Sequence, residues 1–160
     1  MLSLKFITLL LLVSITTCVG QIQTTLVGEH RIIDPSVENM VSMLEMSSSG
    51  WLSQCEDLGF SEDSPYTSAR PGYLLMNKGR VREGGSQHIS KLGTKALLIE
   101  WYHKDNDPRT IFRELLIELE NHIVTNDAEA VLYQFSYKGK KYNGLFMSAG
   151  SQVSFLLQVP

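Results

Sequence analysis

Apolar positions recur every three or four residues in two segments of the chain, and this spacing predicts two helices. The first helix follows Asp34-Pro35, an aspartate suited to capping before a proline suited to the first helical position. Its apolar face consists of Val37, Met40, Val41 and Leu44. The second helix follows Asp107-Pro108, a repeat of the same signal, and ends near His122. Its apolar stripe consists of Ile111, Phe112, Leu115, Leu116 and Leu119.

Shorter segments have the composition of strands and lie at residues 73–76, 96–102, 129–137, 142–147 and 153–159. The strand at 96–102 is almost entirely apolar or aromatic, which is typical of a strand covered on both faces. We expect a short helix in SQHISKLG, residues 86–93, between the first two strands. The order of strands and helices predicts an α/β fold. We expect a single domain with a mainly parallel sheet, flanking helices and a C-terminal hairpin at the edge.

The chain divides into three parts by composition. Residues 1–20 combine one lysine, a short apolar run and small residues leading to Gly20, the layout of a secretory signal peptide. Residues 21–71 are expected to form an arm or short edge strand, the first helix and a long linker, and residues 72–160 the α/β domain. We therefore expect a secreted protein without a membrane span after removal of the signal. The alternative is an uncleaved amphipathic or buried first helix, which would leave the protein cytoplasmic.

Charge and cysteine content narrow the function classes. Without residues 1–20 the chain has 13 basic and 17 acidic side chains, so neither nucleic acid nor an anionic membrane is an expected partner. Cys55 is then the only cysteine, which indicates a free thiol or an intermolecular bridge. A thiol enzyme using Cys55 with His30 or another histidine is a minor alternative, because the adjacent Glu56 and Asp57 raise a thiol pKa.

No cofactor or metal site is predicted. The four histidines lack the spacing of zinc ligands, and the sequence contains neither a phosphate-binding loop nor a GxSxG elbow. The stretch QFSYKGKKYNG, residues 134–144, places Tyr137 at a strand end before a basic, glycine-containing turn. Strand ends often display catalytic side chains, whereas a solvated hairpin tip is the simpler interpretation of these lysines.

From Arg70 onward the order of elements resembles the large subunit of a caspase. The segment GYLLMN is similar to the first strand of that family, and VREGG, residues 81–85, to the loop that carries its substrate-binding arginine. KLGTKALLIEWY resembles the second strand with its preceding Leu-Gly, and YNGLFMSAG occupies the place of a late Asp-Gly run. The resemblance implies that Arg82 could bind an acidic group; a surface arginine is the alternative.

The departures from the caspase pattern concern catalysis. Where the family has Ser-His-Gly, this chain has Ser136-Tyr137-Lys138-Gly139, so Tyr137 marks a degenerate catalytic position. Tyrosine, with a pKa near 10, cannot serve as both base and acid at neutral pH. No cysteine follows Cys55, so the nucleophile of the family is absent as well.

Two functions follow as hypotheses. The first is a catalytically inactive caspase-like protein, a pseudoenzyme that binds a caspase or caspase regulator as a decoy or modulator of proteolysis and cell death. The second is a small secreted α/β binding protein unrelated to caspases. Both predict protein binding without enzyme activity.

Overall fold

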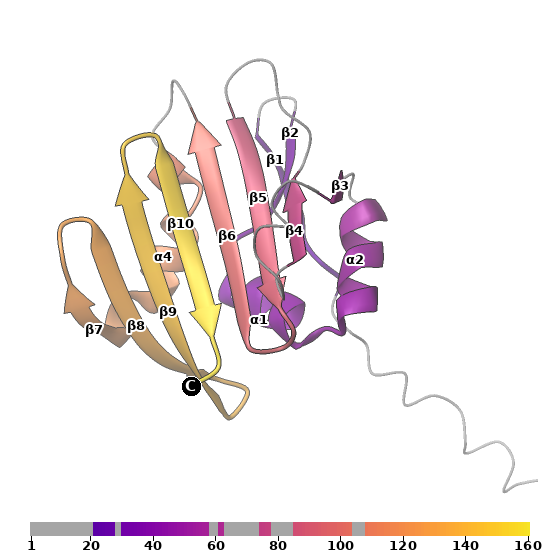
Figure 1. Cartoon of the computed structure of the whole chain (residues 1–160). Coiled ribbons are helices and arrows are strands. Elements are labelled where there is room, and N and C mark those ends of the chain that lie inside the picture. The colour runs from indigo at the N-terminus through magenta and orange to yellow at the C-terminus, as the bar shows by residue number, and fades with distance from the viewer. Residues whose placement is uncertain (1–20, 28–29, 58–60, 63–73, 78–84, 104–107) are drawn as a thin grey trace, which may run out of the picture.

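The computed structural model describes residues 21–27, 30–57, 61–62, 74–77, 85–103 and 108–160, and its centre is one antiparallel sheet (Figure 1). The strand order in this sheet is β3-β4-β5-β6-β10-β9-β8-β7. The strands are β3 (Ser61–Glu62), β4 (Leu74–Asn77), β5 (Gly85–Leu92), β6 (Ala96–His103), β7 (Ile123–Asn126), β8 (Ala130–Tyr137), β9 (Lys140–Ala149) and β10 (Gln152–Gln158).

The remaining described elements are shorter. A separate antiparallel pair consists of β1 (Thr24–Val27) and β2 (His30–Ile33). The helices are α1 (Val37–Glu45), α2 (Ser48–Asp57) and α4 (Arg113–Leu119), the last flanked by the 3-10 turns η1 (Pro108–Thr110) and η2 (Glu120–His122). The described residues thus form a mixed fold with more strand than helix.

The predicted mainly parallel sheet is wrong, because every strand pair in the described residues is antiparallel. The error begins in residues 86–93, which were expected to be a short helix and instead form most of β5. Only residues 93–95 separate β5 from β6. A turn this short can join antiparallel neighbours only, because a parallel pair needs a crossover of about a dozen residues.

The predicted C-terminal hairpin is present as the antiparallel pair β9 and β10, but its predicted position at the sheet edge is wrong. After α4 the chain passes to β7 at the far edge and returns strand by strand through β8 and β9. The last strand, β10, then pairs with both β9 and β6, so it lies in the middle of the sheet. The C-terminal strand β10 therefore joins the two parts of the sheet, β3-β4-β5-β6 and β9-β8-β7.

Both predicted helices are present, with shifted starts. The apolar face predicted for the first helix is buried in α1, although Ser36 caps it in place of Asp34 through a hydrogen bond from the Asn39 amide at 3.2 Å. The second helix is confirmed as α4, whose Leu115 and Leu119 are buried; the predicted cap Asp107 lies outside the described residues. The expected linker after residue 50 is partly helical, since α2 extends to Asp57.

The two faces of the sheet have different surroundings. Helices α1 and α4 and the β1–β2 pair lie on one face, the inner face, behind the strands in Figure 1. Trp101, Ile99, Leu97 and Phe155 belong to the alternate residues that point to this face, and they are buried in one cluster with α1 and α2 residues. That cluster extends from Ile22 to Leu157, so the N-terminal segment and the sheet share one core.

Side-chain amides attach the N-terminal segment to this core. The Ile33 amide donates to Oε1 of Gln87 on β5 at 2.8 Å, and Nε2 of Gln87 donates to the Ile33 carbonyl at 3.0 Å. Asn39 on α1 pairs in the same way with both backbone groups of Gln23, at 3.0 and 3.1 Å. Gln54 on α2 accepts from the Ile22 amide at 3.3 Å. These side-chain amides bond to backbone groups of the N-terminal segment and connect it to β5, α1 and α2.

A buried lysine fixes the end of α1. Lys91 on β5 is 2% exposed, and its Nζ donates to the Leu44 carbonyl at 2.9 Å and to the Gly93 carbonyl. Burial lowers the pKa of this ammonium group. A cation is favourable beside the free carbonyls at a helix C-terminus, so Lys91 ties α1 to the turn between β5 and β6.

Candidate functional site

Tyr137, the predicted degenerate catalytic position, is the last residue of β8 and precedes a tight turn. It pairs with Lys140, the first residue of β9, across the two-residue turn Lys138-Gly139. Both turn residues have positive φ, 48° and 79°, as in the type I′ turns that join antiparallel strands. The local geometry is that of a hairpin, the alternative considered for this stretch.

The hairpin is held against α1 by charge. Lys140 Nζ lies 2.6 Å from Glu45 Oε1, which also accepts from the Tyr142 hydroxyl at 2.8 Å, and Lys138 Nζ lies 3.8 Å from Glu38. The hydrogen bonds from Lys140 and Tyr142 lower the pKa of Glu45. Burial and the hydrogen bond to Glu45 raise the pKa of Tyr142. Two of the three hairpin lysines therefore attach the sheet to the helix.

Of the other predicted sites, Arg82 and Cys55, the structure describes Cys55. Arg82 lies outside the described residues, as does the predicted signal peptide at 1–20. Cys55 is fully buried in α2, and desolvation with the nearby Glu56 charge raises the pKa of its thiol to about 12. A thiol in this state is a poor nucleophile, because the thiolate is the reactive form.

Burial of Cys55 predicts a loss of stability at alkaline pH. Its unfolded pKa of about 8.5 lies below the folded value, so its contribution is complete below pH 8.5 and is lost as the pH rises toward 12. Between pH 7 and pH 10 the wild-type free energy of unfolding should fall by about 2 kcal/mol more than that of Cys55→Ala. Urea unfolding at a series of pH values measures this difference. Titration of the tyrosines affects both proteins equally and therefore cancels in the comparison. Parallel curves would contradict it.

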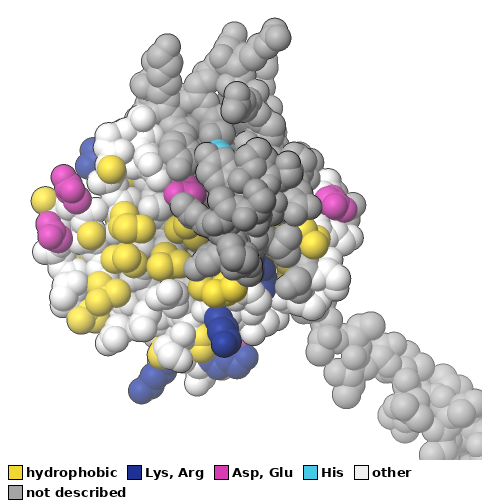
Figure 2. Space-filling view, in the orientation of Figure 1, with side chains coloured by type: hydrophobic (Ala, Val, Ile, Leu, Met, Phe, Trp, Pro, Cys, Tyr) yellow, Lys and Arg dark blue, Asp and Glu magenta, His cyan; other side chains and the backbone are white. Residues whose placement is uncertain are grey.

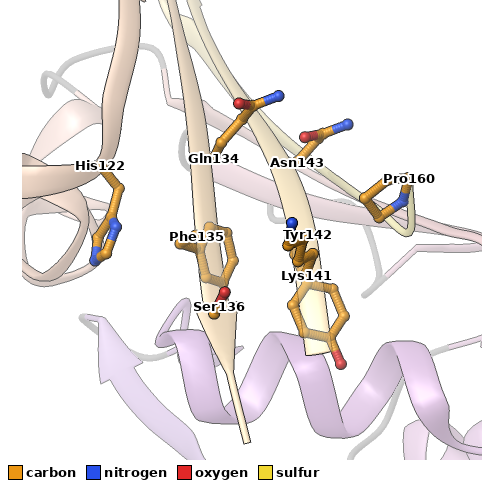
Figure 3. A pocket seen from close by; sticks show the side chains of 8 residues that line it. All are labelled: His122, Gln134, Phe135, Ser136, Lys141, Tyr142, Asn143 and Pro160. Atoms are coloured by element: carbon orange, nitrogen blue, oxygen red, sulfur yellow. The ribbon is translucent and has the colours of Figure 1, made fainter. Parts of the chain in front are cut away.

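An open hollow of ≈ 440 Å³ lies at the lower ends of β8 and β9 (Figure 3). The side-chain amides of Gln134 and Asn143 project to the same side of the sheet there, next to Pro160 (Figure 3). Within the described part of the chain, Ser136 and His122 share no hydrogen bond, and the His122 ring instead lies 6.3 Å from the Phe135 ring. A nucleophile and its base need direct contact, and Ser136 and His122 do not make one here.

A row of leucines lies on the sheet face opposite the described helices, the outer face. Leu132 on β8, Leu145 on β9, Leu156 on β10 and Leu98 on β6 are consecutive cross-strand partners. All four are half-buried, and they alternate with the residues that point into the core. We call these four residues the leucine row; it extends for roughly 14 Å across the sheet.

Further apolar and polar residues surround the leucine row. Met147 and Ala130 pair beside it on one flank, and Gln134 and Asn143 pair on the other. Figure 2 shows hydrophobic side chains gathered over the middle of this face, with basic side chains at its lower end. No described helix covers the outer face in Figure 1. The face therefore combines apolar side chains with a polar and charged border that includes Glu100 and Lys141, which suits contact with another macromolecule.

Apolar residues on both sides of the strands are the signal of this surface in the sequence. Residues 96–102 were expected to be covered on both faces because they are apolar at both odd and even positions. The segments around Leu132, Leu145 and Leu156 share that property. The helices of the described residues cover only the inner face, so the second set of apolar positions remains without a covering helix.

Within the described ranges, no group of three or more histidine, cysteine, aspartate or glutamate side chains is placed to hold a metal ion. None of the helices in those ranges has the length and apolar character needed to cross a membrane.

Comparison with protein-family models, curated proteins and solved structures found no match to this chain.

Proposed function

We propose that this chain is a non-catalytic binding protein and that the outer face, centred on the leucine row, is its contact surface. The observation that supports this most directly is the register of Leu98, Leu132, Leu145 and Leu156 across four adjacent strands, on the face opposite the helices. A sheet covered on one face by its own helices normally has polar residues on the other face. Four aligned leucines there favour a partner that removes them from water.

The secreted location remains part of this proposal and rests on the signal-like residues 1–20. The caspase decoy hypothesis has less support. It required a mainly parallel sheet, and the sheet is antiparallel. Its acidic-group site, Arg82, lies outside the described residues. The alternative hypothesis, a small binding protein unrelated to caspases, therefore agrees better with the geometry.

Site-directed photo-crosslinking tests whether the outer face is the contact surface. A photo-reactive phenylalanine derivative at Leu145 should give a covalent protein adduct, and the same residue at Ile117 should not. Ile117 is a suitable control because it is 54% exposed but lies on α4. Adding Leu156→Asp beside the probe should abolish the adduct, because a charge next to the probe must be desolvated in the complex.

Two results would contradict the proposed surface. One is the absence of an adduct from Leu145 at protein concentrations that prevail where the protein is secreted. The other is an equal yield from Leu145 and Ile117, which would indicate non-specific contact.

A further inference from the structure

The leucine row has the composition of a surface that can pack against itself. It consists of one residue type in consecutive register, and no charged side chain belongs to it. Two sheets packed face to face lie about 10 Å apart, with their inner side chains interdigitated. Leucine rows from two copies would fill that space symmetrically.

Charges at the two ends of the outer face distinguish between possible symmetry axes. Lys141 lies on the outer side of β9, four residues before Leu145, and unlike Lys138 and Lys140 it forms no ion pair within the described residues. Asp127 and Glu129 lie in the turn between β7 and β8, beyond the opposite side of the row, and both are exposed. One end of the outer face is thus basic, and acidic side chains lie in the turn beyond its other end.

A two-fold axis can lie in the interface along the strands or along the leucine row. An axis along the strands places the basic end of one copy on the basic end of the other, so Lys141 repels its equivalent. An axis along the row reverses the strand direction, so the basic end of each copy faces the acidic end of the other. The same axis places Leu145 opposite Leu145 and Leu156 opposite Leu156. Charge complementarity therefore favours the axis along the row.

The size of the face indicates the strength of such a dimer. Strands β6, β8, β9 and β10 each contain at least seven residues. They provide a plan area of roughly 450 Å² at the usual strand spacing and rise. A standard stable interface buries about 800 Å² on each partner. The contact is thus at the weak end of the range, and its occupancy depends on protein concentration.

We propose that the outer face is an interface between two copies of this chain, packed face to face about a two-fold axis along the leucine row. This inference rests on the proposed function, because it names the partner of the same surface. The dimer is weak and exchanging, with leucines at its centre and Lys141 near Asp127 and Glu129 of the second copy at each end.

Sedimentation equilibrium over a wide concentration range tests the dimer with the purified protein. The wild type should show a monomer–dimer equilibrium, and Leu145→Asp should weaken it at least about 30-fold. Ile117→Asp, the matched change on α4, should leave the dissociation constant within about twofold of wild type. Lys141→Glu should weaken the dimer about three- to tenfold. Adding Asp127→Lys to that variant should restore much of the loss, because the pair is then reversed.

Crosslinking tests the axis. In a Cys18→Ser background, Leu145→Cys should give a covalent dimer with a short bis-maleimide, because the two copies of this residue meet at the axis. Gln134→Cys is the control, since its two copies would lie about 14 Å apart along the strands. Buried Cys55 is common to both proteins.

The outcomes separate this inference from the proposed function. A wild type that stays monomeric up to its solubility limit, or a dimer insensitive to Leu145→Asp, overturns the inference. Crosslinking through Gln134→Cys but not through Leu145→Cys overturns the two-fold arrangement. If the photo-probe at Leu145 captures a different protein and the chain remains monomeric, the proposed function stands and the second copy is excluded. If the probe captures nothing, both fail.

Discussion

Replacing Gln87 with leucine should lower the free energy of unfolding by about 3 kcal/mol and the midpoint of thermal unfolding by about 10 °C. Gln87 is 1% exposed, and its amide satisfies both the N–H and the C=O of Ile33. Leucine has a similar size but no polar atoms, so both backbone groups of Ile33 would be buried without partners. Each unsatisfied group costs about 1–3 kcal/mol. Urea unfolding followed by circular dichroism measures the loss.

Two further variants connect this loss to the hydrogen bonds. Gln134→Leu makes the same chemical change at an exposed position of β8 and should alter stability by less than about 0.5 kcal/mol. Gln87→Glu retains an acceptor for the Ile33 amide but presents a carboxylate to the Ile33 carbonyl. Burial raises the folded pKa of the introduced carboxyl, so the variant should regain stability as the pH falls toward about 4, where the protonated group can donate. A loss independent of pH would exclude this account.

The anchors of the N-terminal segment show why part of the fold could not be predicted from the sequence. Apolar periodicity identified α1 and α4, because helix spacing can be recognised within one segment. The contacts of Gln87 with Ile33 and of Asn39 with Gln23 join residues 54 and 16 positions apart. A buried amide has the same composition as an exposed one, so nothing local distinguishes these side chains from surface residues.

Strand pairing was the main error, and β5 is its source. Its core-facing residues are Gln87, Ile89 and Lys91, of which two are polar and buried. A strand normally shows alternating apolar and polar residues, and this alternation is hidden when amide and ammonium groups occupy the inner positions. Once residues 86–93 are assigned to a helix, a parallel crossover between the flanking strands follows. The hydrogen bonds of Gln87 and Lys91 thus explain both the buried polar side chains and the wrong topology.

The candidate surface was present in the sequence only as an ambiguity. Apolar residues on both sides of a strand indicate that both faces of the sheet are covered there. This pattern predicts that residues 96–102 are covered on both faces. The sequence does not specify whether the second covering layer belongs to the same chain. The arrangement of α1 and α4 on one face was needed to identify Leu98 and its three cross-strand partners as a contact surface.

Replacing Gly144 with alanine should destabilise the protein by about 2–3 kcal/mol, although the same change usually stabilises a strand interior. Gly144 lies on the inner side of β9, and a Cβ atom there would be 2.6 Å from Cζ of Phe155. Phe155 is 0% exposed and its ring lies 6.3 Å from that of Tyr133, so it cannot withdraw without disturbing the core. The sign of the change therefore depends on a steric contact.

A double-mutant cycle assigns this destabilisation to Phe155. Phe155→Leu removes the Cζ atom and opens space beside position 144. The double variant, Gly144→Ala with Phe155→Leu, should therefore lose less free energy of unfolding than the sum of the losses of the two single variants, by at least about 1 kcal/mol. Ser148→Ala, also on β9, should be additive with Phe155→Leu because Ser148 pairs with Val153. Chemical denaturation of each protein gives the coupling. Glycine is necessary on the inner face only if the ring of Phe155 approaches position 144 closely. Stabilisation by Gly144→Ala, or additive losses for Gly144→Ala and Phe155→Leu, would show that the two residues pack less closely than this.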